Sequence, residues 1–266
     1  MSDLLKYSIE LVAVLLLALG IKGLSKVRSA RGANQLAAVA MGLAVAGLLL
    51  NYLSTSGLSL AAWSWIIGGT LVGGVLGVIT AQRVPMTSMP ETVALFNGCG
   101  GMSSLLVALA AALYPAALDA TGPVALVSIV VSVFVGSITF TGSIVAMAKL
   151  QGWLSTPPWM QSKLRHVFNI ALAVAALVGA VEMIRNADSG TGLWLLIVSS
   201  SLLGIGVTLP IGGADMPVVI SLLNSYSGVA AAAAGFVVGS QLLIVAGAMV
   251  GAAGLILTQV MCNGMN

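Results

Sequence analysis

The sequence predicts an all-α protein, a polytopic transmembrane bundle of about nine helices. Hydrophobic residues make up 59% of its 266 residues and charged residues only 6%, with a mean hydropathy of +1.11. An ordinary soluble domain has about 25% charged residues. Runs of alternating polarity about ten residues long, which a transmembrane β-barrel requires, are absent, so the spans are predicted to be helical.

Nine segments hold the roughly 20 mostly apolar residues that a helical span needs. In order, they are Leu4–Ile21, Asn34–Tyr52, Ala61–Ala81, Glu91–Tyr114, Gly122–Ala148, His166–Ile184, Gly190–Leu209, Asp215–Val238 and Gln241–Met261. The first segment lacks a small-residue cleavage site and eight spans follow it, so we expect it to be retained as a membrane anchor. Residues 1–266 are therefore predicted to form a single transmembrane domain.

Prolines mark the ends of these segments. All eight fall in connections or at span ends, where a missing N–H is harmless; they are Pro85, Pro90, Pro115, Pro123, Pro157, Pro158, Pro210 and Pro217. The glycines suggest which faces pack. Gly69, Gly73 and Gly77 in the third span, and Gly247 and Gly251 in the ninth, have the small-xxx-small spacing of close helix contacts.

Basic residues collect on one side of the predicted membrane. The connections on that side hold Lys22, Lys26, Arg28, Arg31, Arg83, Lys149, Lys163 and Arg165. The other side offers only Arg185, against Asp119 and Asp188. The positive-inside rule then predicts an N-terminus outside and a C-terminus in the cytoplasm.

The remaining composition narrows the function. The net charge of +3 comes from these loops, so it gives no indication of nucleic-acid binding. Cys99 and Cys262 lie in different elements and do not predict a disulfide, and one histidine with two scattered cysteines makes no metal site. Deep ionisable residues, typical of ion-coupled antiporters, are nearly missing. Glu91 follows Pro90 at a helix start that faces the predicted cytoplasm, where capping and functional roles both stay open.

The segment Ile211–Phe236 places a carboxylate and an amide on one helix. Asp215 precedes Met216 and Pro217 as an N-cap residue precedes a proline of the first turn. Asn224 lies roughly 13 Å further along, at 1.5 Å per residue, well inside a bilayer. A polar group at that depth needs a partner.

Several uncharged polar residues share this inner-half depth, and we expect them to line one hydrated funnel. They are Asn97 in the fourth span, Ser137, Thr139 and Thr141 in the fifth, Asn169 in the sixth, and Asn224, Ser225, Tyr226 and Ser227 in the eighth. In the alternative interpretation, the hydroxyls bond their own helix backbone and the asparagines link helices, each contributing about 0.6 kcal/mol. For Asn97 and Asn224 we favour the functional interpretation, because an amide costs more to bury.

Four segments carry a resemblance to a known family. GGADMPVVISLLNSYSGVAAAAAGF, FTGSIVAMAKLQG, MTSMPETVALFNGCGG and MCNGMN resemble the membrane domain of the β subunit of proton-translocating nicotinamide nucleotide transhydrogenase. The resemblance runs through essentially the whole chain. It implies a subunit of a bacterial inner-membrane enzyme that moves a hydride between NAD(H) and NADP(H) in cytosolic domains while a proton crosses this domain.

The resemblance also assigns roles to residues. Asn97 is the position that some members fill with a titratable histidine, Asn224 is a polar residue of the proton path, and Asp215 is linked to coupling. With them we group Ser137, Thr141, Ser225 and Tyr226 in the path and Glu91 at a coupling helix end. Two positions depart from the family. Asn97 leaves no histidine inside the membrane, so a relaying histidine is expected on a partner-subunit helix, and Val229 replaces an aromatic residue.

Cofactors and partners are expected to lie outside residues 1–266. No G-x-G-x-x-G follows a strand, so we expect this part to bind no cofactor itself, with NADP(H) and NAD(H) held elsewhere in the complete enzyme. The resemblance implies a C-terminal NADP(H)-binding domain after residue 266, absent from this sequence. It further implies an α subunit with an NAD(H)-binding domain and membrane helices, a homodimer and a lipid bilayer.

Two other classes remain as alternatives. A secondary transporter is expected to have inverted repeats and helices broken at the midplane, which prolines confined to connections fit poorly. A purely structural membrane anchor needs none of the Asn and Asp placements. Proton flux in liposomes separates the anchor from both other classes, and substrate uptake without nucleotide would favour the transporter.

Overall fold

The computed structural model describes residues 3–24, 26–55, 59–115, 122–186 and 190–265. Over these ranges the chain is helical, and nine helices are long and apolar enough to cross a membrane, which confirms the predicted spans. Asp119 and Asp188, which entered the prediction of orientation, lie outside the described residues. The chain divides into two compact units, Met1–Pro85 and Met86–Asn266, called unit 1 and unit 2 below.

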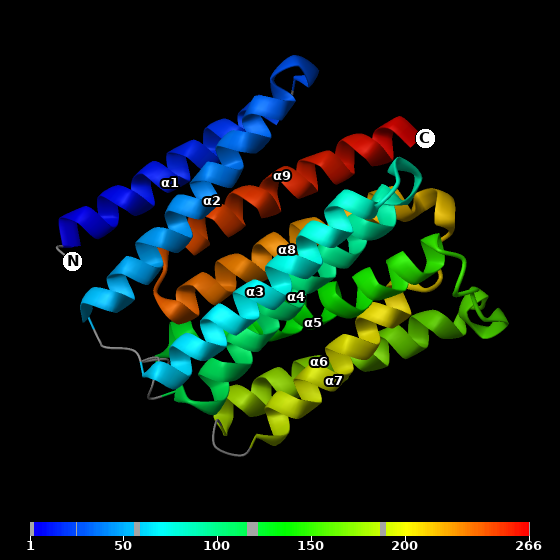
Figure 1. Cartoon of the computed structure of the whole chain (residues 1–266). Coiled ribbons are helices and arrows are strands. Elements are labelled where there is room, and N and C mark those ends of the chain that lie inside the picture. Colours follow the sequence, from blue (N-terminus) through cyan, green and yellow to red (C-terminus); the bar gives the residue numbers. More distant parts are fainter. Residues whose placement is uncertain (1–2, 25, 56–58, 116–121, 187–189, 266) are drawn as a thin grey trace. The chain divides into compact units, whose positions relative to one another are not determined.

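Unit 1 contains α1 (Asp3–Leu24), α2 (Val27–Thr55) and α3 (Leu60–Arg83). The first two helices form an antiparallel pair (Figure 1). Glycines bring the pair close: a Cβ added at Gly23 would lie 2.7 Å from the Cβ of Ala33, and one at Gly47 would lie 2.7 Å from a methyl of Ile9.

The third helix begins with a capping hydrogen bond, because the Ser59 hydroxyl accepts from the backbone N–H of Ala62 at 3.2 Å. None of the residues of α3 is buried. Within the described part of unit 1, no atom lies within 4 Å of a Cβ built on Gly69, Gly73 or Gly77. The predicted glycine face of this helix therefore has no packing partner in its own unit.

The described residues of unit 2 form the remaining six long helices and three short 3₁₀ turns. In order they are η1 (Met86–Ser88), α4 (Met89–Leu113), α5 (Pro123–Leu150), η3 (Pro158–Gln161), α6 (Leu164–Arg185), α7 (Thr191–Thr208), η5 (Gly213–Asp215), α8 (Met216–Val238) and α9 (Gln241–Met265). Prolines lie in the first turn of α4, α5 and α8, where the fixed φ suits a helix and no N–H is needed.

The centre of unit 2 is α5, which packs against α4, α7 and α8, while α6 pairs with α7 and α9 with α8 (Figure 1). Small residues let the backbones approach. A Cβ on Gly101 of α4 would lie 2.9 Å from the carbonyl oxygen of Gly136 in α5. In α9 a Cβ on Gly247 would lie 2.7 Å from the carbonyl oxygen of Gly228 in α8, so the predicted packing role of Gly247 is confirmed.

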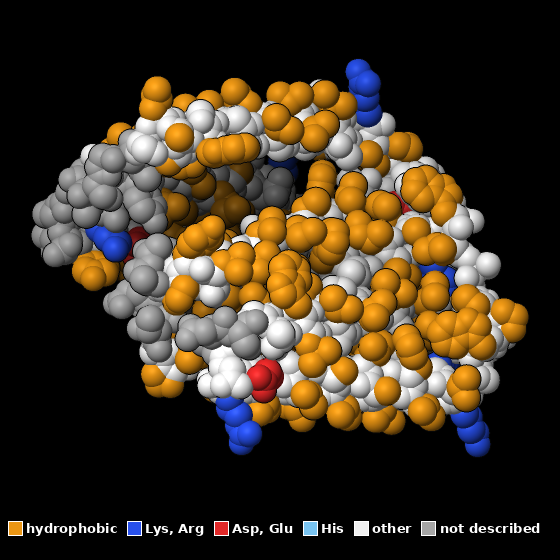
Figure 2. Space-filling model, turned by 90° about the horizontal axis from the view of Figure 1, so that it is seen from below, with side chains coloured by type: hydrophobic (Ala, Val, Ile, Leu, Met, Phe, Trp, Pro, Cys, Tyr) orange, Lys and Arg blue, Asp and Glu red, His pale blue; other side chains and the backbone are white. Residues whose placement is uncertain are grey.

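Apolar side chains dominate the surface (Figure 2). Leu177, Trp194 and Ile256 are among the large hydrophobic residues of unit 2 that are more than half exposed. In water such a surface would be strongly unfavourable, whereas in a bilayer it faces lipid. Together with the nine apolar helices, it identifies a multi-pass membrane protein.

Candidate functional site

A buried amide–hydroxyl pair joins helices α4 and α5 of unit 2. Asn97 of α4 is 8% exposed and Ser143 of α5 is fully buried. The Asn97 Nδ2 donates a hydrogen bond to the Ser143 Oγ at 3.0 Å. Gly98 makes room for this contact, because a Cβ there would lie only 3.1 Å from the Cβ of Ser143.

Half of this amide has no partner among the residues that the structure describes. Among them, the Asn97 Oδ1 and the Ser137 Oγ are buried oxygens without a hydrogen-bond partner. Leaving a buried polar atom unpaired costs about 1–3 kcal/mol, so such atoms mark places where water completes the hydrogen bonding. The Ser143 hydroxyl both accepts and donates, so it can pass hydrogen bonding from the amide to a neighbouring water.

The third wall of this site is α8. A Cβ on Gly100, one turn after Asn97, would lie 2.9 Å from the Oγ of Ser227. The half-buried Ser227 hydroxyl therefore faces α4 close to the Asn97 level. We call Asn97, Ser143 and Ser227 the α4–α5–α8 polar site.

Other predicted path residues lie on a different side of α5. The Thr141 Oγ1 donates to the carbonyl of Ser137 at 3.0 Å and lies 2.8 Å from the carbonyl oxygen of Ser201 in α7. Ser137 is one turn before Thr141 and shares its side of the helix. Asn169 of α6 also reaches α7, donating from Nδ2 to the Gly206 carbonyl at 3.1 Å, while its Oδ1 is unpaired.

The predicted residues of α8 are separated from one another. Ser225 is fully buried against α9, where its hydroxyl donates to the Gly251 carbonyl at 2.6 Å. Asn224 is exposed, and Tyr226 is 36% exposed. Within unit 2, then, the structure places Ser227 against Gly100, one turn from Asn97, and leaves Asn224 on an open face of the helix.

Sequence reasoning missed Ser143, although helical periodicity carried the signal. Ser132, Thr139 and Ser143 recur at intervals of seven and four residues, so they share one side of α5. Ser132 bonds the Ser104 carbonyl of α4 at 3.1 Å, and Thr139 lies against Gly101. Assigning the α5 hydroxyls to sides of the helix, as well as to depths in the membrane, would have placed Ser143 on the side that faces Asn97.

The two predicted coupling carboxylates lie at the same end of unit 2, where α4 and α8 begin and α5 and α7 end. Glu91 occupies the first turn of α4, and its Oε2 accepts a long hydrogen bond from the Gln151 Nε2 at 3.5 Å. Asp215 immediately precedes α8, as predicted, but its side chain makes no capping hydrogen bond. Its own backbone is helical at this position and ends the short turn η5. The exposed carboxylate of Asp215 therefore stays free for another contact.

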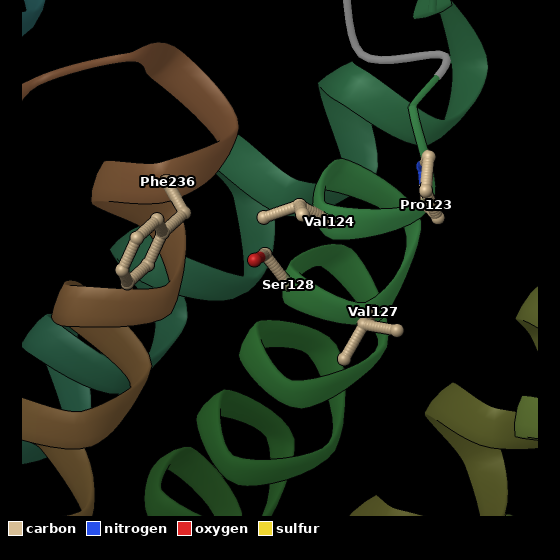
Figure 3. A pocket seen from close by; sticks show the side chains of 5 residues that line it. All are labelled: Pro123, Val124, Val127, Ser128 and Phe236. Carbon is tan, nitrogen blue, oxygen red and sulfur yellow. The ribbon is translucent and has the colours of Figure 1, made fainter.

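An apolar pocket of about 370 Å³ lies at the opposite end of unit 2. Figure 3 shows Phe236 of α8 facing Val124 and Ser128 of α5, with Pro123 and Val127 on its rim. The five lining side chains carry no ionisable group. This pocket has none of the polar groups of the α4–α5–α8 site.

Comparison with known proteins shows the family of this chain. The family model described as NAD(P) transhydrogenase beta subunit matches residues 6–266. The chain belongs to this family. Two sequences named NAD(P) transhydrogenase subunit beta, both from Rhodospirillum rubrum and one of them from a designated strain, are 41% identical to it over 271 aligned residues. The alignments cover 100% of this chain and 57% of each relative, so the chain spans little more than half the length of these relatives.

Membership of the transhydrogenase beta family gives the helices of unit 2 a context. The described residues form helices and no strand, so a βαβ dinucleotide-binding unit is not among them. The chemistry that these residues can perform is to hold water and to orient its hydrogen bonds inside the membrane.

Proposed function

We propose that unit 2 carries the proton path of a proton-translocating NAD(P) transhydrogenase. The observation that carries this proposal is the buried Asn97 amide, bonded to Ser143 on one side and unpaired at Oδ1 on the other. The amide does not titrate. It orients water by accepting at Oδ1, while the Ser143 and Ser227 hydroxyls, each donor and acceptor, continue the hydrogen-bonded chain along which a proton moves.

The partners follow from the family and from the open face of α8. Hydride transfer between NAD(H) and NADP(H) takes place in cytosolic domains, one of them a C-terminal NADP(H)-binding domain and the other carried by an α subunit. Asn224 is an exposed amide nine residues inside a transmembrane helix, and facing lipid would cost it its hydrogen bonds. A membrane helix of the α subunit covers this face and brings a titratable group to the path, and two such units form a dimer.

Coupling is assigned to the end of unit 2 that carries Asp215 and Glu91. The Asp215 carboxylate is exposed and makes no cap bond, so it is available to a docked cytosolic domain. Glu91 begins the helix that holds Asn97, roughly 9 Å away along the axis at 1.5 Å per residue. A change of hydration at Asn97 therefore has a short route to the docking end.

The experiment compares proton pumping and hydride transfer for Asn97→Leu in the complete enzyme reconstituted in liposomes. Leucine keeps the volume and removes both polar atoms, so we expect pumping to fall about tenfold or more, equivalent to about 1.4 kcal/mol or more of added barrier. Asn97→His restores a hydrogen-bonding side chain and should retain pumping. Ser104→Ala, a buried change two turns further along α4, is the matched control. Pumping by Asn97→Leu at the parental ratio to hydride transfer would exclude the proposed path.

The orientation that this function requires is an N-terminus outside and a C-terminus in the cytoplasm of a bacterial inner membrane. The asymmetry of Lys and Arg among the connections supports it. Single cysteines replacing Ser29, in the first turn of α2, and Ser59, just before α3, test it after the native Cys99 and Cys262 are changed to alanine. An impermeant reagent applied outside should label only Ser59→Cys; labelling of both from one side would contradict the orientation.

A further inference from the structure

The Lys149 side chain joins three segments at the end of unit 2 where α5 and α7 end. It lies in the last turn of α5 and is half-buried. Its Nζ donates to the Thr156 Oγ1 at 2.7 Å, to the Leu209 carbonyl at 2.7 Å and to the Ile211 carbonyl at 2.6 Å. An ammonium group has three N–H donors, so all three are used.

The acceptors show what this lysine holds in place. Leu209 is the C-cap residue of α7, where backbone carbonyls lack helical partners and the helix dipole favours a cation. The Thr156 hydroxyl also donates to the Leu209 carbonyl, at 3.1 Å. Lys149 thus binds the end of α7, the α5–α6 connection and the start of the α7–α8 connection at a single point.

Among the described residues, the α7–α8 connection has few other hydrogen bonds. Its backbone bonds are short-range turns, from the Ile211 N–H to the Thr208 carbonyl at 3.2 Å and from the Asp215 N–H to the Gly212 carbonyl at 3.2 Å. Gly212 and Gly213 add no side chains that would pack the segment. The Ile211 side chain packs on the hydrophobic cluster around Met216. The ammonium of Lys149 adds hydrogen bonds that join this connection directly to α5.

We propose that Lys149 is a positioning residue that fixes the α7–α8 connection, and with it Asp215, to the end of α5. This inference rests on the proposed function, because Ser143 lies on the same helix only six residues earlier. A shift of α5 caused by changes around Ser143 reaches Asp215 through the Lys149 bonds. Lys163, whose side chain is exposed just before α6, offers the contrast of a surface lysine.

The first test measures, in the complete enzyme, whether Lys149 restrains the α7–α8 connection. Hydrogen exchange followed by mass spectrometry measures the exchange rate of the backbone amides of residues 208–216 in the parent, Lys149→Met and Lys163→Met. Methionine keeps the length of the side chain and removes every donor. We expect about tenfold faster exchange of this segment in Lys149→Met, because bonds from a charged donor are lost, and parental exchange in Lys163→Met.

The second test measures the consequence as protons pumped per hydride transferred. We expect Lys149→Met to lower this ratio at least twofold while hydride transfer continues, and Lys149→Arg, which keeps a cation with N–H donors, to recover part of it. Parental exchange in Lys149→Met, or a parental ratio despite faster exchange, would overturn the proposal. Asn97→Leu, assayed in parallel, tests the proposed proton path separately. If this variant pumps protons normally, the proposed path is wrong, even where residues 208–216 exchange faster in Lys149→Met.

Discussion

Two polar regions of unit 2 differ in how completely their hydroxyl and amide groups are hydrogen-bonded. In the seam between α8 and α9, Ser221 and Ser225 donate to the carbonyls of Gly254 and Gly251, and the Thr258 hydroxyl donates to Gly254 and lies 3.0 Å from the Ser221 Oγ. Between α4 and α5, the Asn97 Oδ1 has no hydrogen-bond partner in the part of the chain that the structure describes. Both regions are buried and both lie inside apolar helices.

The difference separates polar groups that are paired across helices from a polar group that keeps an unpaired acceptor, where we propose that water binds. We expect the seam to exclude water because glycines bring its backbones together: a Cβ on Gly228 would meet the Gly251 nitrogen and would lie 2.8 Å from the Gly247 carbonyl oxygen. At Asn97 an acceptor is left over after protein contacts are made, which is the condition for a structural or conducting water.

The largest expected effect is on the seam. Gly228→Val places methyl groups where the α9 backbone lies, so we expect a loss of about 3 kcal/mol of stability. Thermal unfolding in detergent should show a clearly lower midpoint than the parent. Ala252→Val, on an exposed position of α9 beside Gly251, is the control and should unfold near the parental temperature. Equal midpoints for both variants would mean that the seam is not close-packed.

A smaller effect is expected from a single hydroxyl of the seam. Ser225→Ala removes one bond to the Gly251 carbonyl, which in membrane helices is worth about 0.6 kcal/mol. The ratio of protons to hydride should stay parental, because the Ser225 hydroxyl is already paired with the Gly251 carbonyl and we expect the seam to exclude water. A large loss of pumping with parental stability would place Ser225 in the proton path and remove the distinction between the two regions.

The smallest change in stability is expected at Asp215, which belongs to neither region. Its exposed side chain makes no capping bond, so Asp215→Asn should alter stability by less than about 0.5 kcal/mol. Removing the charge should nevertheless lower the ratio of protons to hydride, because the docked domain loses a contact. Unfolding and pumping assays on the same preparation separate these outcomes. A stability loss well above that limit would assign the residue a structural role.

The sequence predicted the helices well because each is bounded by local signals. Pro90, Pro123 and Pro217 mark the starts of three helices, and Gly239, with φ of 65°, follows α8 in the left-handed conformation that glycine favours. The site was predicted less completely, since depth along a helix does not say which way a side chain points. Asn224 and Ser225 are neighbours in sequence, yet one is exposed and the other is buried against α9.

Asp215 illustrates the same limit at a helix end. Its residue type and the following proline correctly predicted where α8 begins, whereas its cap bond is absent because the backbone enters the helix through the turn η5. Whether a side chain bonds its own helix depends on φ and ψ at that residue, which the sequence does not specify.

The most direct test asks whether water reaches Asn97 and fails to reach Ser225. In the complete enzyme with Cys99 and Cys262 changed to alanine, Asn97→Cys and Ser225→Cys are each exposed to Ag⁺, which needs water to travel and binds thiolate. Mass spectrometry after denaturation and alkylation then counts the thiols that Ag⁺ protected. We predict protection of Asn97→Cys and none of Ser225→Cys. Equal protection of the two, or protection of Ser225→Cys alone, would contradict the assignment of a hydrated path to α4 and α5 and a dry seam to α8 and α9.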